Sequence, residues 1–213
     1  MAHRVAALVL AAGSSRRMKT SKQLLLLGNK PVLRHCVDTL SATGVQDLVV
    51  VTGTGQAACS EALWGARVRT VVNEKPDSQM ADSVRKGLCA VDETCSGVLV
   101  CLADHPLVSF NTYQAIINVH HRYPEKIIIP AFEGMRGHPS LFPFSVISDI
   151  FFFPTLRDVV REDNERVLVI DVPDEGVVLD MDTRDDYRVV LERYALQKND
   201  LPQRPQSTQR KAE

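Results

Sequence analysis

The sequence has no long hydrophobic run and no surplus of charge. A membrane span needs roughly 18 to 20 consecutive apolar residues, and no stretch approaches that length. The 25 basic and 26 acidic residues leave a formal net charge of −1, which argues against a protein that binds nucleic acid or a membrane surface through charge alone. We therefore expect neither a membrane nor a nucleic acid as a partner.

Cysteine is sparse and follows no metal-binding pattern. The sequence has five cysteines and no C-x-x-C pair, which argues against a zinc site and against a disulfide framework. The pattern of a signal peptide is also missing, because Met1 to Arg4 lead directly into the predicted strand Val5–Leu10. These features predict a cytoplasmic protein whose cysteines are free thiols.

The sequence also lacks the Walker loop, G-x-x-x-x-G-K-[ST], of many nucleotide-binding proteins. A different loop follows the first predicted strand. Five small residues stand there: Ala11, Ala12, Gly13, Ser14 and Ser15. Small residues let backbone N–H groups approach a ligand closely, and Arg17 and Lys22 add positive charge beside them. The segment therefore predicts a phosphate-binding loop of another kind.

Short apolar runs alternate with helical patterns as far as Pro130. The predicted strands are Val5–Leu10, Leu48–Val51, Val68–Val72, Val98–Leu102 and Ile127–Ile129. The predicted helices are Pro31–Ser41, Gln56–Trp64, Met80–Val91 and Phe110–His121. Nearly continuous β-branched strands are typical of parallel strands buried on both faces, and the alternation indicates βαβ units. We predict an α/β fold, a Rossmann-like three-layer sandwich with a mostly parallel central sheet.

The pattern changes after Pro130. Ala131–Phe144 contains the glycines and prolines typical of a loop with a short extended segment. The elements predicted beyond it are a helix at Pro154–Glu162, a strand at Val167–Ile170, a turn at Pro173–Gly176, a strand at Val177–Leu179 and a helix at Thr183–Leu196. We predict one domain over residues 1–196 and a disordered polar tail over residues 197–213.

Ligands of an open parallel sheet collect beyond the carboxyl ends of its strands. Asp104 stands at such an end, and a carboxylate there could bind Mg²⁺ together with phosphate oxygens. It could instead cap the next helix, but Ser109 lies closer to that helix and suits the role better. Asp180 and Asp182 follow another predicted strand, and as alternate residues they could face one site. Asp182 could complete the metal site or cap the last helix.

Polar residues also stand at the start of the helix predicted from Met80. Asp82, Ser83 and Arg85 lie there, and polar groups in a first helical turn can contact a base or a ribose. Simple capping by Asp82 is the alternative. His138 lies in a Gly-His-Pro sequence within the glycine- and proline-rich segment, and such loops carry binding residues. This placement predicts that His138 contacts substrate, with acid–base catalysis as the less favoured role.

Two further patterns have structural explanations. Residues 53–58 fit the dinucleotide fingerprint G-x-G-x-x-[GA]. They belong to the second βαβ unit, however, whereas the first loop offers the cations. His120 and His121 end a helix, where an imidazole suits the helix dipole. With no cysteine or carboxylate at a suitable spacing, the pair predicts a surface feature and no metal site.

These motifs taken together resemble a known family. The segment LVLAAGSSRRMKTSKQLLLLGNKPVLRH is similar to the opening of nucleotidyltransferases with a GT-A-like fold. The segments SQMADSVRKGL, VLVCLADHPLVS, RGHPSLF and VVLDMDTRDDY resemble those of molybdopterin cytidylyltransferases in order and spacing. The resemblance covers residues 4–192.

The resemblance implies a nucleotidyltransferase domain with two substrates. It implies transfer of a nucleoside monophosphate, CMP from CTP, to a phosphorylated acceptor such as molybdopterin, with release of pyrophosphate. It also implies Mg²⁺ as cofactor and a molybdenum hydroxylase apo-enzyme as a further partner.

The resemblance assigns roles to individual residues of this chain. The nucleotide-binding residues are Leu10, Ala11, Ala12, Gly13, Ser14, Ser15, Arg17, Lys22, Asp82 and Ser83. The catalytic residues are Arg17, Lys22 and Asp104, and the metal ligands are Asp104 and Asp182. The residues that border the acceptor are Gly137, His138 and Pro139.

The chain departs from the family pattern at two places. Lys19 stands where the family usually has glycine, and FFFPTLRDVVRED, residues 151–163, replaces a Gly-Asp-x-Gly-Ala-Arg-like loop. Because both departures bear on the acceptor, two alternatives stay open. One is a cytidylyltransferase of a sugar, polyol or isoprenoid-precursor phosphate, and the other is a non-catalytic cofactor-binding accessory protein. The choice between CTP and GTP is open as well.

Overall fold

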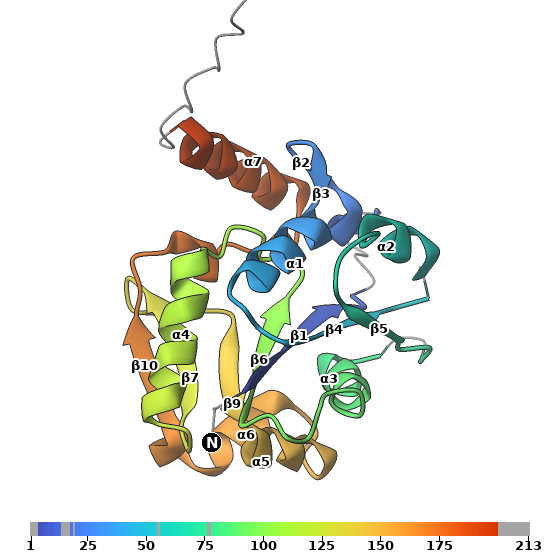
Figure 1. The fold of residues 1–213 in the computed structure, drawn as a ribbon. Helices are drawn as coiled ribbons and strands as arrows, with labels where there is room; N and C mark the ends of the chain where they lie inside the picture. The colour runs from blue at the N-terminus through green and yellow to red at the C-terminus, as the bar shows by residue number, and fades with distance from the viewer. Residues whose placement is uncertain (1–3, 14–17, 19, 55, 76–77, 200–213) are drawn as a thin grey trace, which may run out of the picture.

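An eight-stranded sheet with helices on both faces forms the centre of the fold (Figure 1). The computed structural model describes residues 4–13, 18, 20–54, 56–75 and 78–199. The strands of this sheet are β1 (Val5–Ala11), β4 (Asp47–Thr52), β5 (Arg69–Val72), β6 (Gly97–Leu102), β7 (Ile127–Phe132), β8 (Met135–Arg136), β9 (Ser140–Pro143) and β10 (Val167–Asp171). Their order is β10-β7-β9-β6-β1-β4-β5, and β8 pairs with β7.

Most neighbouring strands of the sheet are parallel. β1 lies between β4 and β6 and is parallel to both, β5 is parallel to β4, and β10 is parallel to β7. β9 is antiparallel to both β6 and β7. The predicted α/β fold with a mostly parallel sheet is therefore confirmed.

The helices lie where the sequence predicts them, with several short additions. The α-helices are α1 (Val32–Ala42), α2 (Gln56–Ala62), α3 (Met80–Leu88), α4 (Phe110–Arg122), α5 (Phe144–Ile147), α6 (Leu156–Glu162) and α7 (Arg184–Asn199). The 3₁₀ helices are η1 (Lys22–Leu24), η2 (Ser148–Phe151), η3 (Asn164–Arg166) and η4 (Glu175–Val177). α7 continues past residue 197, where the sequence predicts the tail to begin; residues 200–213 lie outside the described part.

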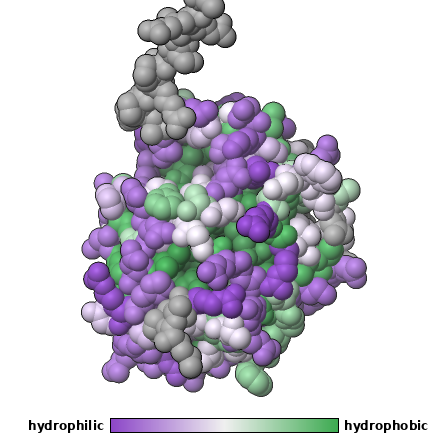
Figure 2. Space-filling view, in the orientation of Figure 1, coloured by the Kyte–Doolittle hydropathy of each residue, from purple (hydrophilic) through white to green (hydrophobic). Residues whose placement is uncertain are grey.

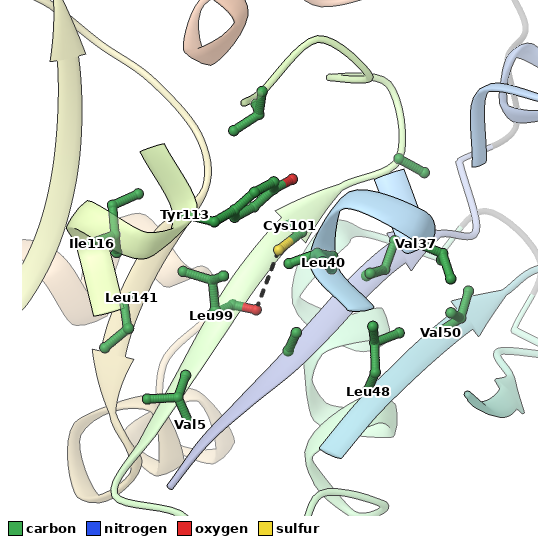
Figure 3. Packing of buried hydrophobic residues seen from close by; sticks show 14 of the residues in the cluster. Val5, Val37, Leu40, Leu48, Val50, Leu99, Cys101, Tyr113, Ile116 and Leu141 are labelled. Atoms are coloured by element: carbon green, nitrogen blue, oxygen red, sulfur yellow. Dashed lines mark hydrogen bonds between the residues drawn. The ribbon is translucent and has the colours of Figure 1, made fainter. Parts of the chain in front are cut away.

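Alternate residues of β1 pack against two different helical layers. Val5, Ala7 and Val9 belong to a core shared with α1 and α4, part of which Figure 3 shows. Ala6 and Leu8 belong to a second core shared with α3, α5 and α6. Both cores are buried, as expected for a central parallel strand. The three-layer arrangement follows directly from this alternation.

Helix α3 approaches the sheet closely because it has a glycine at the contact. A Cβ atom added at Gly87 would lie 2.1 Å from Leu8 Cδ1 and 2.8 Å from Val51 Cγ2. This close approach holds α3 against β1 and β4. The first turn of the helix lies beside the end of β1, where the candidate site lies.

A smaller apolar cluster holds α7 against a two-stranded hairpin. The hairpin consists of β2 (Leu26–Leu27) and β3 (Lys30–Pro31) and lies beside α7 in Figure 1. Leu27, Met181 and Val190 are buried in this cluster. The Tyr187 hydroxyl also donates a hydrogen bond to the Leu26 carbonyl at 2.5 Å. The segment before α7, which contains Asp182, is fixed by this packing.

The segment Ala131–Phe144 is more regular than the predicted loop. β7 continues to Phe132, and Glu133 and Gly134 then make a two-residue turn with φ angles of 49° and 79°. Two consecutive positive φ angles are typical of a tight hairpin. β8 and β9 follow, and β9 enters the sheet between β6 and β7. α5 and η2 come next and are also absent from the prediction.

The predicted strand Val177–Leu179 is wrong. Helix η4 stands there, because the N–H groups of Val178 and Leu179 both donate to the Glu175 carbonyl. The Val177 carbonyl instead accepts the His138 N–H at 2.8 Å. Of the apolar side chains that suggested a strand, Val177 is buried in this tight turn, and Val178 and Leu179 are partly buried.

The prediction that both helix-ending histidines lie on the surface is wrong for His120. Its side chain is fully buried, and its Nε2 lies 3.1 Å from the Ser96 hydroxyl. A Cβ at Gly97 would lie 2.6 Å from His120 Nε2, so the imidazole fills the space that this glycine leaves. His121 is exposed, as predicted.

All five cysteines are free thiols, as predicted. Four of them, Cys36, Cys59, Cys95 and Cys101, are buried, and Cys89 is exposed. Burial raises the pKa of Cys36 to about 12. A thiol with so high a pKa is a poor nucleophile at neutral pH.

Within the described ranges, no helix is both long and apolar enough to cross a membrane. The face drawn in Figure 2 shows hydrophilic and hydrophobic areas interspersed with one another.

Candidate active site

A pocket opens at the carboxyl ends of β1 and β6, beside the first turn of α3. Three parts of the chain line it: the end of β1 and the loop after it at Leu10, Ala11, Ala12 and Gly13; the start of α3 at Ser78, Gln79, Met80 and Ser83; and the end of β6 at Leu102, Ala103 and Asp104. Lys22 and Gln23 of η1 complete the lining. The structure therefore brings together six of the predicted nucleotide-binding residues, Leu10 to Gly13, Lys22 and Ser83, together with Asp104.

Three predicted residues of the first loop cannot be placed. Ser14, Ser15 and Arg17 lie outside the described residues, and so does Lys19. Their roles stay predictions.

The structure brings Asp104 and Asp182 to the same cation. Lys22 Nζ lies 2.5 Å from Asp104 Oδ2 and 2.8 Å from Asp182 Oδ1. The side chains of Lys22 and Asp104 are only 15% and 17% exposed. Burial alone would lower the pKa of Lys22, but the two carboxylates outweigh this effect and raise the pKa above its ordinary value. The three groups therefore form a charged, partly buried cluster at the edge of the pocket.

The donor set of this cluster fits a magnesium ion. Mg²⁺ uses one or two carboxylates and completes its shell with phosphate oxygens and water, and two carboxylates converge here on one cation position. Among the described residues, no group of three or more His, Cys, Asp or Glu side chains could hold a metal ion, so phosphate oxygens and water would complete the shell. Metal binding by Asp104 and Asp182 stays a prediction that this geometry supports.

Asp180 lies near the same cluster but is exposed. Desolvation of its carboxyl group by neighbouring atoms and the negative charge of Asp182 raise its pKa.

Gln23 is a pocket residue that the sequence reasoning missed. Its side chain is 8% exposed, and its Nε2 donates a 3.0 Å hydrogen bond to the Ala11 carbonyl. The bond ties η1 to the first loop and so fixes the backbone that carries Lys22. The only sequence signal is its position directly after Lys22.

Ser83 and Asp82 have different surroundings in α3. Ser83 is buried, lines the pocket and accepts a 3.0 Å hydrogen bond from Asn73 Nδ2. Asp82 accepts the Gln79 N–H at 2.9 Å and pairs with Lys75. These two partners lower the pKa of Asp82. The structure thus shows the capping role of Asp82, and its contact with a nucleotide stays a prediction.

Close packing fixes the Gly-His-Pro segment on η4. A Cβ at Gly137 would lie 2.2 Å from the Val177 carbonyl oxygen, so only glycine fits there. The His138 N–H donates to that same carbonyl, and the peptide bond between His138 and Pro139 is cis. The His138 ring meets the His105 ring edge to face, with centroids 5.5 Å apart. His105 directly follows Asp104, so the predicted acceptor residues lie close to the predicted metal ligands.

A buried carboxylate connects η4 to α4. Asp174 is 8% exposed and accepts hydrogen bonds from the Ser109 N–H at 2.9 Å, the Thr112 hydroxyl at 2.5 Å and the Gly176 N–H at 3.0 Å. Ser109 is the N-cap of α4, as the sequence predicts. Asp174 is a positioning residue that the sequence reasoning missed.

His138 makes the folded state sensitive to acid. Burial, aided by the neighbouring His105, lowers the pKa of His138 to about 4. An unfolded chain binds this proton near its ordinary pKa of about 6.5, so the stability from His138 is present above pH 6.5 and is lost as the pH falls toward 4. Between about pH 7.5 and pH 5 we expect the wild type to lose about 2 kcal/mol more unfolding free energy than His138→Gln.

Urea unfolding at the two pH values measures this difference. The control is His121→Gln, because His121 is exposed. This variant should lose as much unfolding free energy as the wild type does. Equal losses in the wild type and in His138→Gln would show that the His138 pKa is not lowered.

Of the dinucleotide fingerprint, the described residues Gly53, Thr54, Ala57 and Ala58 lie outside the pocket lining. A Cβ at Gly53 would lie 3.2 Å from the Ala12 carbonyl oxygen, so this glycine lets β4 end close to the first loop. Gly53 therefore serves the packing of β4 against the first loop.

Comparison with protein families gives one match over most of the chain. Residues 7–169 match the model described as MobA-like NTP transferase domain. A curated relative, the bifunctional protein GlmU of Sorangium cellulosum, is 36% identical over 110 residues, which are 48% of this chain and 23% of GlmU. The chain thus spans about a quarter of the length of that relative.

Solved structures match almost the whole chain. Rv0371c from Mycobacterium tuberculosis H37Rv is 30% identical with a TM-score of 0.77, and the match covers 90% of this chain and 99% of that one. A complex of the same protein with manganese matches with 29% identity and a TM-score of 0.72, over 89% and 98% of the chains. The CMP:2-keto-3-deoxy-manno-octonic acid synthetase complexed with CTP is 12% identical with a TM-score of 0.76, over 91% and 99%. At that identity the last match shows the fold alone.

Proposed function

Because the chain belongs to the family of MobA-like NTP transferase domains, we propose that it transfers CMP from CTP to a phosphorylated small molecule and releases pyrophosphate. The observation that carries this proposal is the convergence of Asp104, Asp182 and Lys22 at the edge of a pocket lined by the first loop. This arrangement supports a role for the first loop in phosphate binding and for the two carboxylates in cation binding. CTP as the donor is supported by the fold shared with a synthetase whose structure contains CTP.

The reaction needs positioning and charge neutralisation more than covalent help. An oxygen of the acceptor phosphate attacks the α-phosphorus of CTP, the bond from that phosphorus to the bridging oxygen breaks, and pyrophosphate leaves. A phosphate monoester is ionised near pH 7, so the acceptor needs no general base. This agrees with the edge of the pocket, where Lys22 supplies a cation and Asp104 and Asp182 supply carboxylates.

The proposal gives separate roles to the first loop, the cations and the carboxylates. The N–H groups of the first loop bind the triphosphate, and Lys22 and Arg17 neutralise the charge on the departing pyrophosphate. Asp104 and Asp182 would hold Mg²⁺, which would supply positive charge to neutralise the phosphates. The manganese complex of Rv0371c supports a divalent cation in this family.

For the acceptor we propose molybdopterin, bound beside Gly137, His138 and Pro139. The support is the resemblance of the RGHPSLF and VVLDMDTRDDY segments, and the short path from the His138 ring through His105 to Asp104. A molybdenum hydroxylase apo-enzyme that receives the product is part of the same proposal.

Pyrophosphate release by the purified protein tests the proposal. The assay combines each of the four NTPs with Mg²⁺ and one of four acceptors: molybdopterin, a sugar phosphate, a polyol phosphate or methylerythritol phosphate. We expect release with CTP and molybdopterin. Release with another acceptor would replace molybdopterin but keep the reaction, and binding of CTP without release in any combination would favour the non-catalytic accessory protein.

A further inference from the structure

Lys22 contacts the predicted metal ligands, although its predicted role is to bind phosphate. Its ammonium nitrogen lies 2.5 Å from Asp104 and 2.8 Å from Asp182. Mg²⁺ bound to the same two oxygens would lie about 2.0–2.1 Å from each of them. Two cations cannot occupy this one position, so the ammonium and a metal ion compete for the carboxylates.

The lysine can leave this position without a change of fold. The backbone at η1 is held by the bond from Gln23 to the Ala11 carbonyl. The charge of Lys22, however, sits at the end of a flexible four-carbon side chain. Lys22 also lines the pocket together with Ala11 to Gly13. A triphosphate bound there would offer the ammonium a new anionic partner within reach of the same side chain.

We propose that Lys22 makes the carboxylate pair selective for a metal–triphosphate complex over a free divalent cation. Without nucleotide, the ammonium neutralises Asp104 and Asp182 and excludes a free metal ion. When a metal–triphosphate complex binds, the Lys22 ammonium moves to its phosphates. Asp104 and Asp182 are then available to bind the metal. This inference rests on the proposed function, and it assigns Lys22 a specificity role in addition to the neutralisation of pyrophosphate.

Mn²⁺ binding without turnover tests the inference. The electron paramagnetic resonance signal of free Mn²⁺ measures binding to the full chain, with and without the non-hydrolysable α,β-methylene analogue of CTP. We expect Lys22→Met to bind Mn²⁺ alone about tenfold tighter than the wild type, a factor within the usual range for coupled sites. We also expect the CTP analogue to tighten Mn²⁺ binding more in the wild type than in Lys22→Met.

Three variants make the result specific. Lys22→Gln keeps a polar side chain without the charge and should tighten Mn²⁺ binding as Lys22→Met does, which guards against a folding defect in one variant. Lys30→Met removes a lysine that pairs with Asp38 at 2.6 Å outside the pocket, and it should bind Mn²⁺ as the wild type does. Adding Asp104→Asn to Lys22→Met should abolish the gain.

Equal affinity of the wild type and both Lys22 variants for Mn²⁺ alone would overturn the inference, and so would no detectable binding in any of them.

Failure of the inference is distinguishable from failure of the proposed function. If the protein releases pyrophosphate but the Lys22 variants bind Mn²⁺ as the wild type does, the inference alone is refuted. Tighter binding of Mn²⁺ by the Lys22 variants, in a protein that never releases pyrophosphate, would refute the proposed function alone.

Discussion

Replacing Asp104 with asparagine is expected to lower the rate of pyrophosphate release by about a thousandfold, the upper range for loss of one preorganised charge-stabilising group. The amide keeps the size of the carboxylate but removes the charge that holds a cation at the end of β6. Asp104 lies closer to the Lys22 ammonium than Asp182 does, at 2.5 Å against 2.8 Å, and it is the less exposed of the two carboxylates. Steady-state rates at saturating CTP and acceptor measure the effect.

The control is Asp163→Asn. Asp163 lies in the connection before β10, and its carboxylate accepts the Glu165 N–H at 2.9 Å, which an amide oxygen can also accept. This variant should keep the wild-type rate. If Asp104→Asn unfolds at the wild-type temperature and also keeps the wild-type rate, Asp104 is not a metal ligand of the reaction.

Replacing Asp174 with alanine is expected to lower the unfolding free energy by about 3 kcal/mol, because buried donors are left without an acceptor. Three donors lose this acceptor: the Ser109 N–H, the Thr112 hydroxyl and the Gly176 N–H. η4 would then lose its connection to α4. Since η4 also holds the Gly-His-Pro segment, the KM for the acceptor should rise more than the KM for CTP.

Denaturant unfolding and the two KM values measure these effects, with Asp149→Ala as the matched control. Asp149 is 39% exposed and lies 3.8 Å from Arg166, and exposed pairs of this kind contribute at most about 1 kcal/mol. Asp174→Asn keeps one oxygen and should lose less stability than Asp174→Ala. Equal losses in Asp174→Ala and Asp149→Ala would show that Asp174 does not fix η4.

The core of the fold could be predicted because its elements depend on local patterns. The apolar runs of β1, β4 and β6 are long enough to require burial on both faces, and the helices between them carry one apolar stripe each. β9 was missed because Ser140–Pro143 contains only four residues, with glycine and proline nearby. Its place in the sheet depends on pairing with β6 and β7, which a local pattern does not contain.

The site was predictable where it follows the end of a strand. Asp104 leaves β6 at the edge that parallel strands share, and that rule places it correctly in the pocket. The contact between Lys22 and Asp182 joins residues 160 positions apart, so no spacing in the sequence encodes it. The burial of His120 depends in the same way on the space beside Gly97, in another element.

The place of β1 in the middle of the sheet has a consequence for the growing chain. β1 needs partners on both edges, and β4 completes one edge once Thr52 has been made. The other edge can pair only after β6, which ends at Leu102, has been made. At a synthesis rate of about 5–20 residues per second, the intervening stretch takes roughly 3–10 s. During that interval an apolar strand edge is open to other chains, so aggregation of nascent chains should be greatest when synthesis stalls between these two strands.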